Sequence, residues 1–145
     1  MTPISTSAEI NRPAAEVFAY ATDPARFHEW QEGVLDGHME CAGTPVVGTR
    51  CLTTRQIGLA KRQVSAEVTH IDPPRTWAVR GIDGPIRAEV SVHVTELDSA
   101  RSRLVIDIEF AGRGIGKILV PLVIRRQARK EMPANVAALA RNLES

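Results

Sequence analysis

The sequence predicts an α+β fold in which a curved, seven-stranded antiparallel sheet wraps around a long C-terminal helix, with two short helices between strands 1 and 2. Three observations lead to this prediction. Apolar and polar residues alternate with a period of two over residues 34–110, clusters of Gly, Pro and Asp interrupt that alternation, and residues after 114 return to helical spacing. At 145 residues the chain has the usual size of one domain, so we expect a single domain over residues 1–145.

A strand and two short helices are expected first. Residues 4–10 alternate weakly, which is typical of a strand with one polar face. Apolar residues then recur at helical spacing over residues 13–21, with Asn11 as the expected N-cap and Pro13 in the first turn. Asp23 is expected to cap the second helix.

A six-stranded meander and the closing helix are expected to follow. In the closing segment Met132, Val136 and Leu143 keep the spacing of an amphipathic helix, whereas Pro133 should kink that helix or split it in two. The last two strands show the clearest alternation, with a dry face and a wet face. The dry face comprises Ile86, Ala88, Val90, Val92, Val94, Leu104, Ile106, Ile108 and Phe110.

Composition and charge argue against several classes of function. A net charge of +1 does not indicate a nucleic-acid partner. Residues 1–10 lack the basic flank and apolar run of a secretory signal, and the longest apolar run, residues 118–124, is too short to span a membrane. We therefore expect a cytoplasmic protein.

The two cysteines, Cys41 and Cys51, do not form a recognisable metal site, because there is no CxxC pair and no histidine at ligand spacing. They could face each other across a hairpin, although thiols in a reducing cytoplasm usually remain free. We expect no metal and no cofactor, and the sequence leaves open whether the two thiols pair.

An internal cavity is expected between the sheet and the closing helix. A twisted sheet has a large apolar face that one helix covers only in part. Aromatic residues, which commonly fill such gaps, make up only 4% of the chain. A flatter sheet could instead collapse onto the helix and leave no cavity.

Short motifs along the whole chain resemble a known superfamily. The segment Pro13 to Phe18, the Thr22-Asp23-Pro24 turn and Trp30 look like the SRPBCC (START-like) superfamily, which joins START lipid-transfer domains, birch-pollen-allergen-like proteins and polyketide cyclases/dehydrases. The turn from Asp72 to Trp77 and the basic closing helix resemble its bacterial polyketide cyclase/dehydrase and lipid transport branch. The resemblance implies a helix-grip fold and a pocket for a hydrophobic molecule, but no single reaction, because carriers, sensors and enzymes share the scaffold.

The predicted ligand-binding residues are mostly aliphatic. For any single one of them, packing on the closing helix is the favoured alternative, because pocket walls and core faces use the same residue types. Trp77 could stack on a ring-bearing ligand or fill the core, whereas Trp30 is expected to plug the junction of helix and sheet. The predicted ligand-binding set is Trp77, Val79, Val90, Val92, Ile106, Ile108, Leu119, Val123 and Gln127.

No catalytic constellation is evident, so the catalytic residues are unknown. Two or more inward-pointing side chains among Arg55, Arg80, His70 and Gln127 would favour an enzyme, although long polar side chains usually reach solvent. The polar residues expected on the wet faces of their strands are Glu89, His93 and Asp107.

Basic residues gather around the start of the closing helix. They could contact anionic lipid peripherally or an acidic partner, or they could form an ordinary solvated face. The six residues are Arg113, Lys117, Arg125, Arg126, Arg129 and Lys130.

The favoured function is binding or carriage of a small hydrophobic molecule, such as a lipid, an isoprenoid or an aromatic polyketide-like compound, by a monomer or homodimer without a bound cofactor. The rival hypothesis is a cofactor-free cyclase or dehydratase that uses the same cavity. A third is a regulatory or stress-linked interaction protein.

Overall fold

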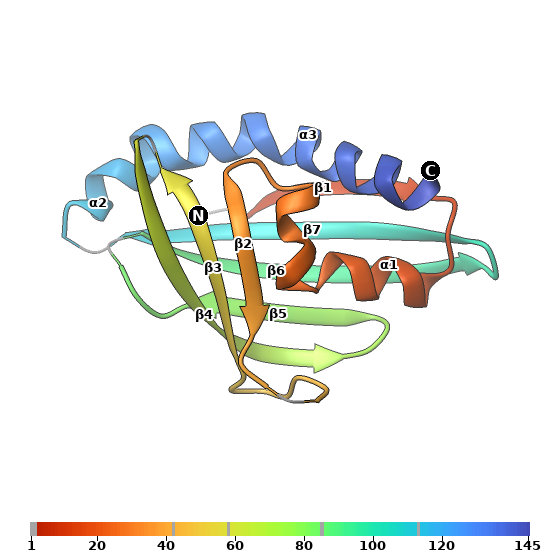
Figure 1. Cartoon of the computed structure of the whole chain (residues 1–145). Helices are drawn as coiled ribbons and strands as arrows, with labels where there is room; N and C mark the ends of the chain where they lie inside the picture. The colour runs from red at the N-terminus through yellow and green to blue at the C-terminus, as the bar shows by residue number, and fades with distance from the viewer. Residues whose placement is uncertain (1–2, 42, 58, 85, 113) are drawn as a thin grey trace.

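The computed structural model describes residues 3–41, 43–57, 59–84, 86–112 and 114–145. It consists of a seven-stranded antiparallel sheet with a long helix lying across it (Figure 1), which confirms the predicted fold class. The strands are β1 (Ile4–Ile10), β2 (Val34–Met39), β3 (Arg50–Ile57), β4 (Ala60–Asp72), β5 (Thr76–Gly81), β6 (Ile86–Asp98) and β7 (Arg101–Gly112). The helices are α1 (Ala14–Ala21), the 3₁₀ helix η1 (Pro24–Glu29), α2 (Gly116–Leu119), the π helix η2 (Val120–Ile124) and α3 (Arg125–Glu144).

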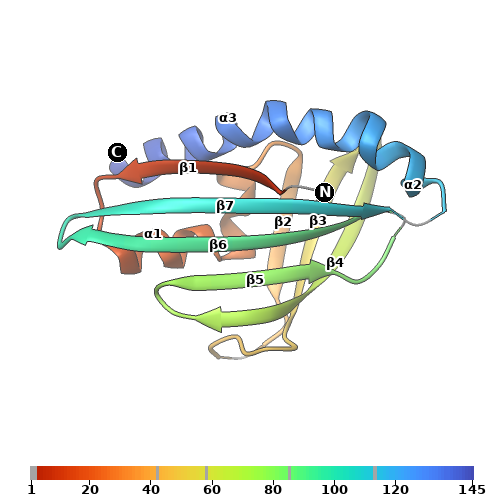
Figure 2. The ribbon, with the colours of Figure 1, turned by 180° about the vertical axis from the view of Figure 1, so that it is seen from behind.

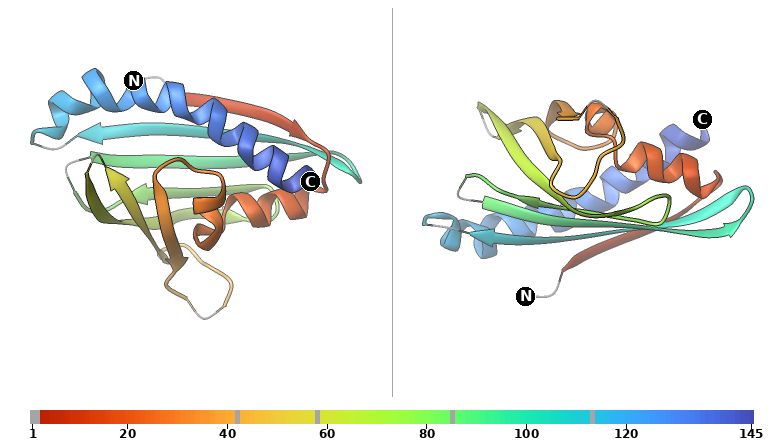
Figure 3. Two further views of the ribbon diagram at one scale, coloured as in Figure 1. Left: turned by 45° about the horizontal axis from the view of Figure 1, so that its top comes forward. Right: turned by 90° about the horizontal axis from the view of Figure 1, so that it is seen from below.

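The strand order places the first strand beside the last. The order is β1-β7-β6-β5-β4-β3-β2, so β2 to β7 form a meander and β1 closes the far edge next to β7. Figure 2 shows β1, β7 and β6 from behind as long ribbons that lie side by side. Register shifts at residues 34–36, 68–70 and 96–98 interrupt the ladders, and such bulges bend strands. Figure 3 shows the result, in which β2, β3 and β4 turn out of the plane of β1, β6 and β7.

The two short N-terminal helices begin differently from each other. The expected N-cap of α1, Asn11, does not cap it; its backbone N–H is donated to the Glu144 carboxylate at 3.3 Å instead. Pro13 occupies the N-cap position, and its carbonyl accepts the N–H groups of Glu16 and Val17. The prediction for Asp23 is confirmed, because its carboxylate accepts the N–H of Ala25 at 3.0 Å.

The closing helix is not split at Pro133, contrary to one of the two expected outcomes. Helix α3 runs from Arg125 to Glu144 through that residue. Pro133 is exposed, whereas Val136 and Leu139 are buried and hold the helix on the sheet, so burial offsets the missing hydrogen bond. The irregular turn lies earlier, in η2.

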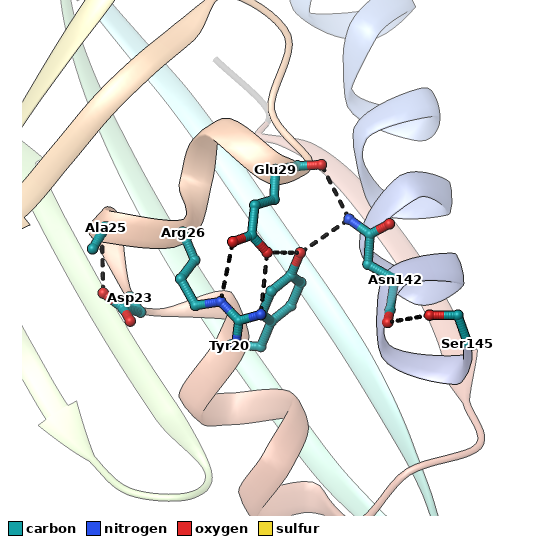
Figure 4. A network of polar contacts seen from close by, with 7 residues as sticks. All are labelled: Tyr20, Asp23, Ala25, Arg26, Glu29, Asn142 and Ser145. Atoms are coloured by element: carbon teal, nitrogen blue, oxygen red, sulfur yellow. Dashed lines mark hydrogen bonds and ion pairs between the residues drawn. The ribbon is translucent and has the colours of Figure 1, made fainter.

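A polar network fastens the C-terminal end of α3 to α1 and η1 (Figure 4). The amide of Asn142 donates to the hydroxyl of Tyr20 and to the backbone carbonyl of Glu29, both at 3.0 Å. The Tyr20 hydroxyl in turn donates to the Glu29 carboxylate at 3.0 Å, and Arg26 pairs with that carboxylate at 3.1 Å while lying 4.4 Å from the centre of the Tyr20 ring. The network fixes one end of the helix across the sheet.

Candidate functional site

A cavity of about 390 Å³ lies between the concave face of the sheet and the first half of α3. Its walls come from η1, from β3 to β7 and from α3. The volume is within the range of roughly 300–1,000 Å³ that is usual for small-molecule sites. The alternative in which the sheet collapses onto the helix therefore does not occur.

The dry face of β6 and β7 changes character along its length. Towards the turn that joins the two strands, Val94 and Leu104 are buried in the core and do not line the cavity. Towards the opposite end, Val90 and Ile108 are only half-buried and line the cavity. Core packing and pocket wall are thus both present on one face, at different distances along the strands.

Two tryptophans and a phenylalanine form an aromatic group in the cavity wall. Phe27 meets Trp30 edge to face with ring centres 5.7 Å apart, and it meets Trp77 in the same way at 6.5 Å. Both tryptophans are buried, yet neither indole N–H has a hydrogen-bond partner in the described part of the chain. Buried N–H groups normally find a partner, so these two donors could bond to an acceptor outside the described residues, such as a water molecule or a ligand.

Arg55 is the cation of the cavity wall. Its Nε donates to the hydroxyl of Thr53 at 3.2 Å, and no carboxylate among the described residues lies within ion-pairing distance of its guanidinium. Burial lowers the pKa of Arg55, but a guanidinium stays charged near neutral pH. The cavity therefore contains a positive charge that an anionic or strongly accepting group would stabilise.

Cys51 projects from the same face of β3 as Thr53 and Arg55 and also lines the cavity. Burial raises its pKa to about 11, with a smaller contribution from Asp23, and the nearby Arg55 opposes that rise. The thiol is therefore protonated at neutral pH. Cys41 is exposed, and both cysteines are free.

Polar groups form a rim on the helix side. Gln127 donates to the Glu131 carboxylate at 2.9 Å, and the amide oxygen of the buried Asn135 accepts the backbone N–H of Glu32 at 3.1 Å. The second contact ties the segment before β2 to α3. No group of three or more His, Cys, Asp or Glu suited to a metal occurs within the described ranges.

Residues 1–144 match the family described as polyketide cyclase / dehydrase and lipid transport. The chain belongs to this family. No curated protein matches it.

Solved structures with the fold of this family member include Zhui aromatase/cyclase from Streptomyces sp. R1128, with a TM-score of 0.80 and 14% identity over 98% of this chain and 93% of the other. A conserved protein from Geobacillus kaustophilus has a TM-score of 0.68 and 22% identity, covering 96% of this chain and 93% of the other. The di-domain ARO/CYC BexL from the BE-7585A biosynthetic pathway has a TM-score of 0.76 and 15% identity over 99% of this chain. The chain spans only 47% of BexL. At these identities the similarity establishes the fold.

Most of the predicted ligand-binding set lines the cavity of this family member. Val123 does not; it is 47% exposed on the outer side of η2, where the wide π turn brings Ile124 to the cavity instead. The side chain of Leu119 lies outside the described part of the structure. The residues of the set that line the cavity are Trp77, Val79, Val90, Val92, Ile106, Ile108 and Gln127.

The polar candidates divide evenly. Arg55 and Gln127 line the cavity, whereas Arg80 and His70 are exposed and do not. His70 instead shares a hydrogen bond of 2.6 Å with the hydroxyl of Thr76. The expected surface residues Glu89 and His93 are exposed and Asp107 is half-buried, none of them at the cavity.

Sequence reasoning missed several wall residues. Phe27 and Thr53 were given no role, and Trp30 was assigned only to the junction of helix and sheet, although it lines the cavity as well. The period-two spacing of Cys51, Thr53 and Arg55 on β3 could have indicated a shared inward face.

Over the described residues, no helix is long and apolar enough to cross a membrane.

Proposed function

We propose that the protein binds a small amphipathic molecule, with its apolar body along the aliphatic wall and an acceptor oxygen near Arg55, Trp30 and Trp77. The observation that carries the proposal is an apolar cavity with polar donors that lack partners in the described chain. An acceptor on the ligand would satisfy donors that are otherwise costly to bury. Family membership supports a hydrophobic ligand of this kind.

The proposal can be tested with two fluorescent probes that share an aromatic body. N-Phenyl-1-naphthylamine is neutral, and 8-anilinonaphthalene-1-sulfonate adds an anionic group. We expect both to bind. The Arg55→Met variant should bind the sulfonate probe about tenfold or more weakly, because a hydrogen bond to a charged group contributes about 1.5–3 kcal/mol. Its affinity for the neutral probe should change by less than about twofold.

The matched control is Arg80→Met, which removes the same charge from an exposed position on β5. It should leave both affinities unchanged. Urea unfolding of each variant verifies that it is folded. Failure of the neutral probe to bind the folded wild-type protein would contradict the proposed cavity function. An equal loss of affinity for the sulfonate probe in the Arg55→Met and Arg80→Met variants would contradict the role of Arg55.

A cyclase or dehydratase is the second candidate, since Arg55 and Gln127 both line the cavity, Arg55 in its wall and the exposed Gln127 at its rim. The guanidinium and the indole N–H groups could stabilise an enolate oxygen. The carboxylates in the cavity lining are Glu32 and Glu131, and Glu131 already accepts a hydrogen bond from Gln127 on the helix side. Cys51 is held protonated, and no histidine among the described residues lines the cavity. Binding without chemistry therefore has the better support.

We also propose a cytoplasmic location, a monomer or homodimer, and no nucleic-acid partner, bound metal or cofactor. The modest net charge of +1 supports the absence of a nucleic-acid partner. Light scattering after size-exclusion chromatography measures the oligomeric state, and native mass spectrometry of protein from its own host identifies any bound small molecule.

A further inference from the structure

Large apolar side chains are exposed where the chain leaves the sheet for the closing helix. Ile115, Ile118 and Leu122 are 66%, 60% and 61% exposed, and Val123 is 47% exposed. Ile115, Ile118 and Leu122 recur at the spacing of one helical face. We call these four residues the apolar patch.

The apolar patch is the outer side of an amphipathic segment. The opposite side consists of Gly116 and Val120, which are buried, and Ile124, which is half-buried and lines the cavity. The inner side already packs against the protein, so the outer side is free to contact something else. Single exposed apolar residues are common, but a contiguous set of this kind usually marks an interaction site.

The apolar patch lies at the end of the molecule that the cavity reaches. Cavity-lining residues at this end include Gln56 of β3, Ile86 of β6 and Phe110 of β7. Figures 1 and 3 show that the β3–β4 hairpin lies at the same end as α2. At the tip of that hairpin, Leu59 is fully exposed. Exposed apolar side chains at this end of the molecule therefore belong both to the helical segment that carries the apolar patch and to the β3–β4 hairpin.

Positive charge surrounds the apolar patch. Residues 110–130 contain six Lys or Arg and no Asp or Glu, whereas the rest of the chain holds 12 basic and 17 acidic residues. Lys117, Arg126, Arg129 and Lys130 are exposed and continue along the helix from the patch. The near-neutral net charge thus conceals a strongly basic end.

We propose that the apolar patch and its basic surroundings dock the protein on a membrane that contains anionic phospholipid, with the cavity end facing the bilayer. Amphipathic helical segments with Lys and Arg beside apolar side chains bind such surfaces by inserting the apolar groups among the headgroups. Each basic residue near the surface adds about 1 kcal/mol, which corresponds to roughly fivefold in affinity. A hydrophobic ligand could then pass between bilayer and cavity without crossing water.

Co-sedimentation with vesicles tests the proposal. We expect binding to vesicles of phosphatidylcholine mixed with phosphatidylglycerol, little binding to phosphatidylcholine alone, and release on addition of salt. The Ile118→Ser/Leu122→Ser variant should bind at least about tenfold more weakly, since each side chain contributes about 1.5–3 kcal/mol when fully buried. The Lys117→Gln/Arg126→Gln variant should bind the anionic vesicles roughly twentyfold more weakly than the wild-type protein.

The matched control is Val46→Ser/Val47→Ser. Both valines are 62% exposed, in the connection between β2 and β3. This variant should bind vesicles like the wild-type protein. Absence of wild-type binding to the anionic vesicles, equal binding to both vesicle types, or an equal loss in the valine variant would each overturn the proposal.

Two further measurements separate this proposal from others. If light scattering shows a wild-type dimer that the Ile118→Ser/Leu122→Ser variant dissociates, and neither binds vesicles, the patch is a subunit interface and the proposal is wrong. Each variant is also titrated with N-phenyl-1-naphthylamine. Vesicle binding without probe binding in the wild-type protein would count against the proposed function of the cavity and leave membrane docking intact.

Discussion

Burial changes the chemistry of the two titratable side chains that β3 directs to the cavity. Removal from water favours the neutral form of an ionisable group, so it raises the pKa of the Cys51 thiol and lowers the pKa of the Arg55 guanidinium. Because the reference values of the two groups lie so far apart, the wall holds a cation and a neutral thiol at neutral pH. Cys51 is therefore present in the cavity wall as a neutral thiol at neutral pH.

The pKa of Cys51 predicts a particular dependence of stability on pH. The thiol ionises near pH 9 when unfolded and only near 11 when folded, so the free energy of unfolding should fall as pH rises from about 9 to about 11. The Cys51→Ala variant should lack this part of the fall. Urea unfolding of both proteins at several pH values measures the difference.

Alkylation gives an independent check. With iodoacetamide at neutral pH, Cys51 should react at least about a hundredfold more slowly than in the unfolded chain, because its thiolate fraction is that much smaller. Exposed Cys41, followed by mass spectrometry of the same samples, is the internal control. Similar rates at Cys51 in the folded and unfolded protein would contradict its burial.

Sequence alone could assign a residue to a face but not to a depth. Alternation placed Val90 and Val94 together, and yet Val94 is buried in the core away from the cavity while Val90 borders it. The difference depends on how far along β6 the covering helices extend, which is a property of the whole fold. The inward position of Arg55 was one of four possibilities for the same reason.

The closing helical region, from α2 to α3, is attached to the rest of the protein at both of its ends. At the C-terminal end Asn142 and Tyr20 join α3 to the N-terminal helices. At the other end, the turn of α2 lies directly on the end of β7, because a Cβ at Gly112 would overlap the backbone carbonyl of Gly116. These two attachments hold α3 across the sheet and keep the cavity open beneath it.

The Asn142→Ala variant should lower the free energy of unfolding by about 1–3 kcal/mol. It removes two hydrogen bonds, each contributing about 0.5–1.5 kcal/mol, and leaves a part-buried acceptor on Tyr20 and an exposed one on Glu29. Arg141→Ala, at an exposed neighbouring position, should change it by less than about 0.5 kcal/mol. Urea unfolding compares the two, and equal effects would argue against the network as an anchor.

The Gly112→Ala variant should lower the free energy of unfolding by about 1–3 kcal/mol, because the new methyl group forces β7 and α2 apart. Gly43→Ala is the control, since a Cβ there meets nothing within 4 Å. Thermal unfolding monitored by circular dichroism measures both. A fully stable Gly112→Ala protein would mean that the junction relaxes without cost.

Element prediction succeeded where local signals dominate and failed where tertiary packing overrides them. Asp23 caps η1 as its position before Pro24 indicates. Asn11 does not cap α1, because the helix begins at Ala14 with Pro13 in the N-cap position, two residues after Asn11. Pro133 indicates a broken helix by its local effect on the backbone. This local indication takes no account of the buried side chains that pack α3 against the sheet and keep it continuous.

The molecule as a whole is packed at one end and open at the other. The completely buried apolar side chains among the described residues are Ile10, Val17, Val68, Leu104 and Leu139; all but Val68 of β4 belong to β1, α1, β7 and α3, whereas the cavity lies towards β3 and the start of α3. An unfilled interior forgoes apolar contacts, so the fold gives up stability to keep the cavity.

The Ala88→Leu variant tests this trade-off. The added carbons should fill part of the cavity, raise the free energy of unfolding by about 1 kcal/mol, and weaken binding of N-phenyl-1-naphthylamine by about tenfold. Ala111→Leu, at an exposed position of β7, should change neither quantity appreciably. Unchanged probe binding in a folded Ala88→Leu protein would place the probe elsewhere.

The pairing of β1 with β7 also affects how the protein is made. Ile4 lies opposite Ile108, so the first strand synthesised has no partner until the last strand has left the ribosome. Contacts between such distant segments form slowly, whereas hairpins such as β3–β4 can form early. A growing chain therefore carries an open sheet with an uncovered apolar face until α3 is complete, and that interval is when it most needs a chaperone.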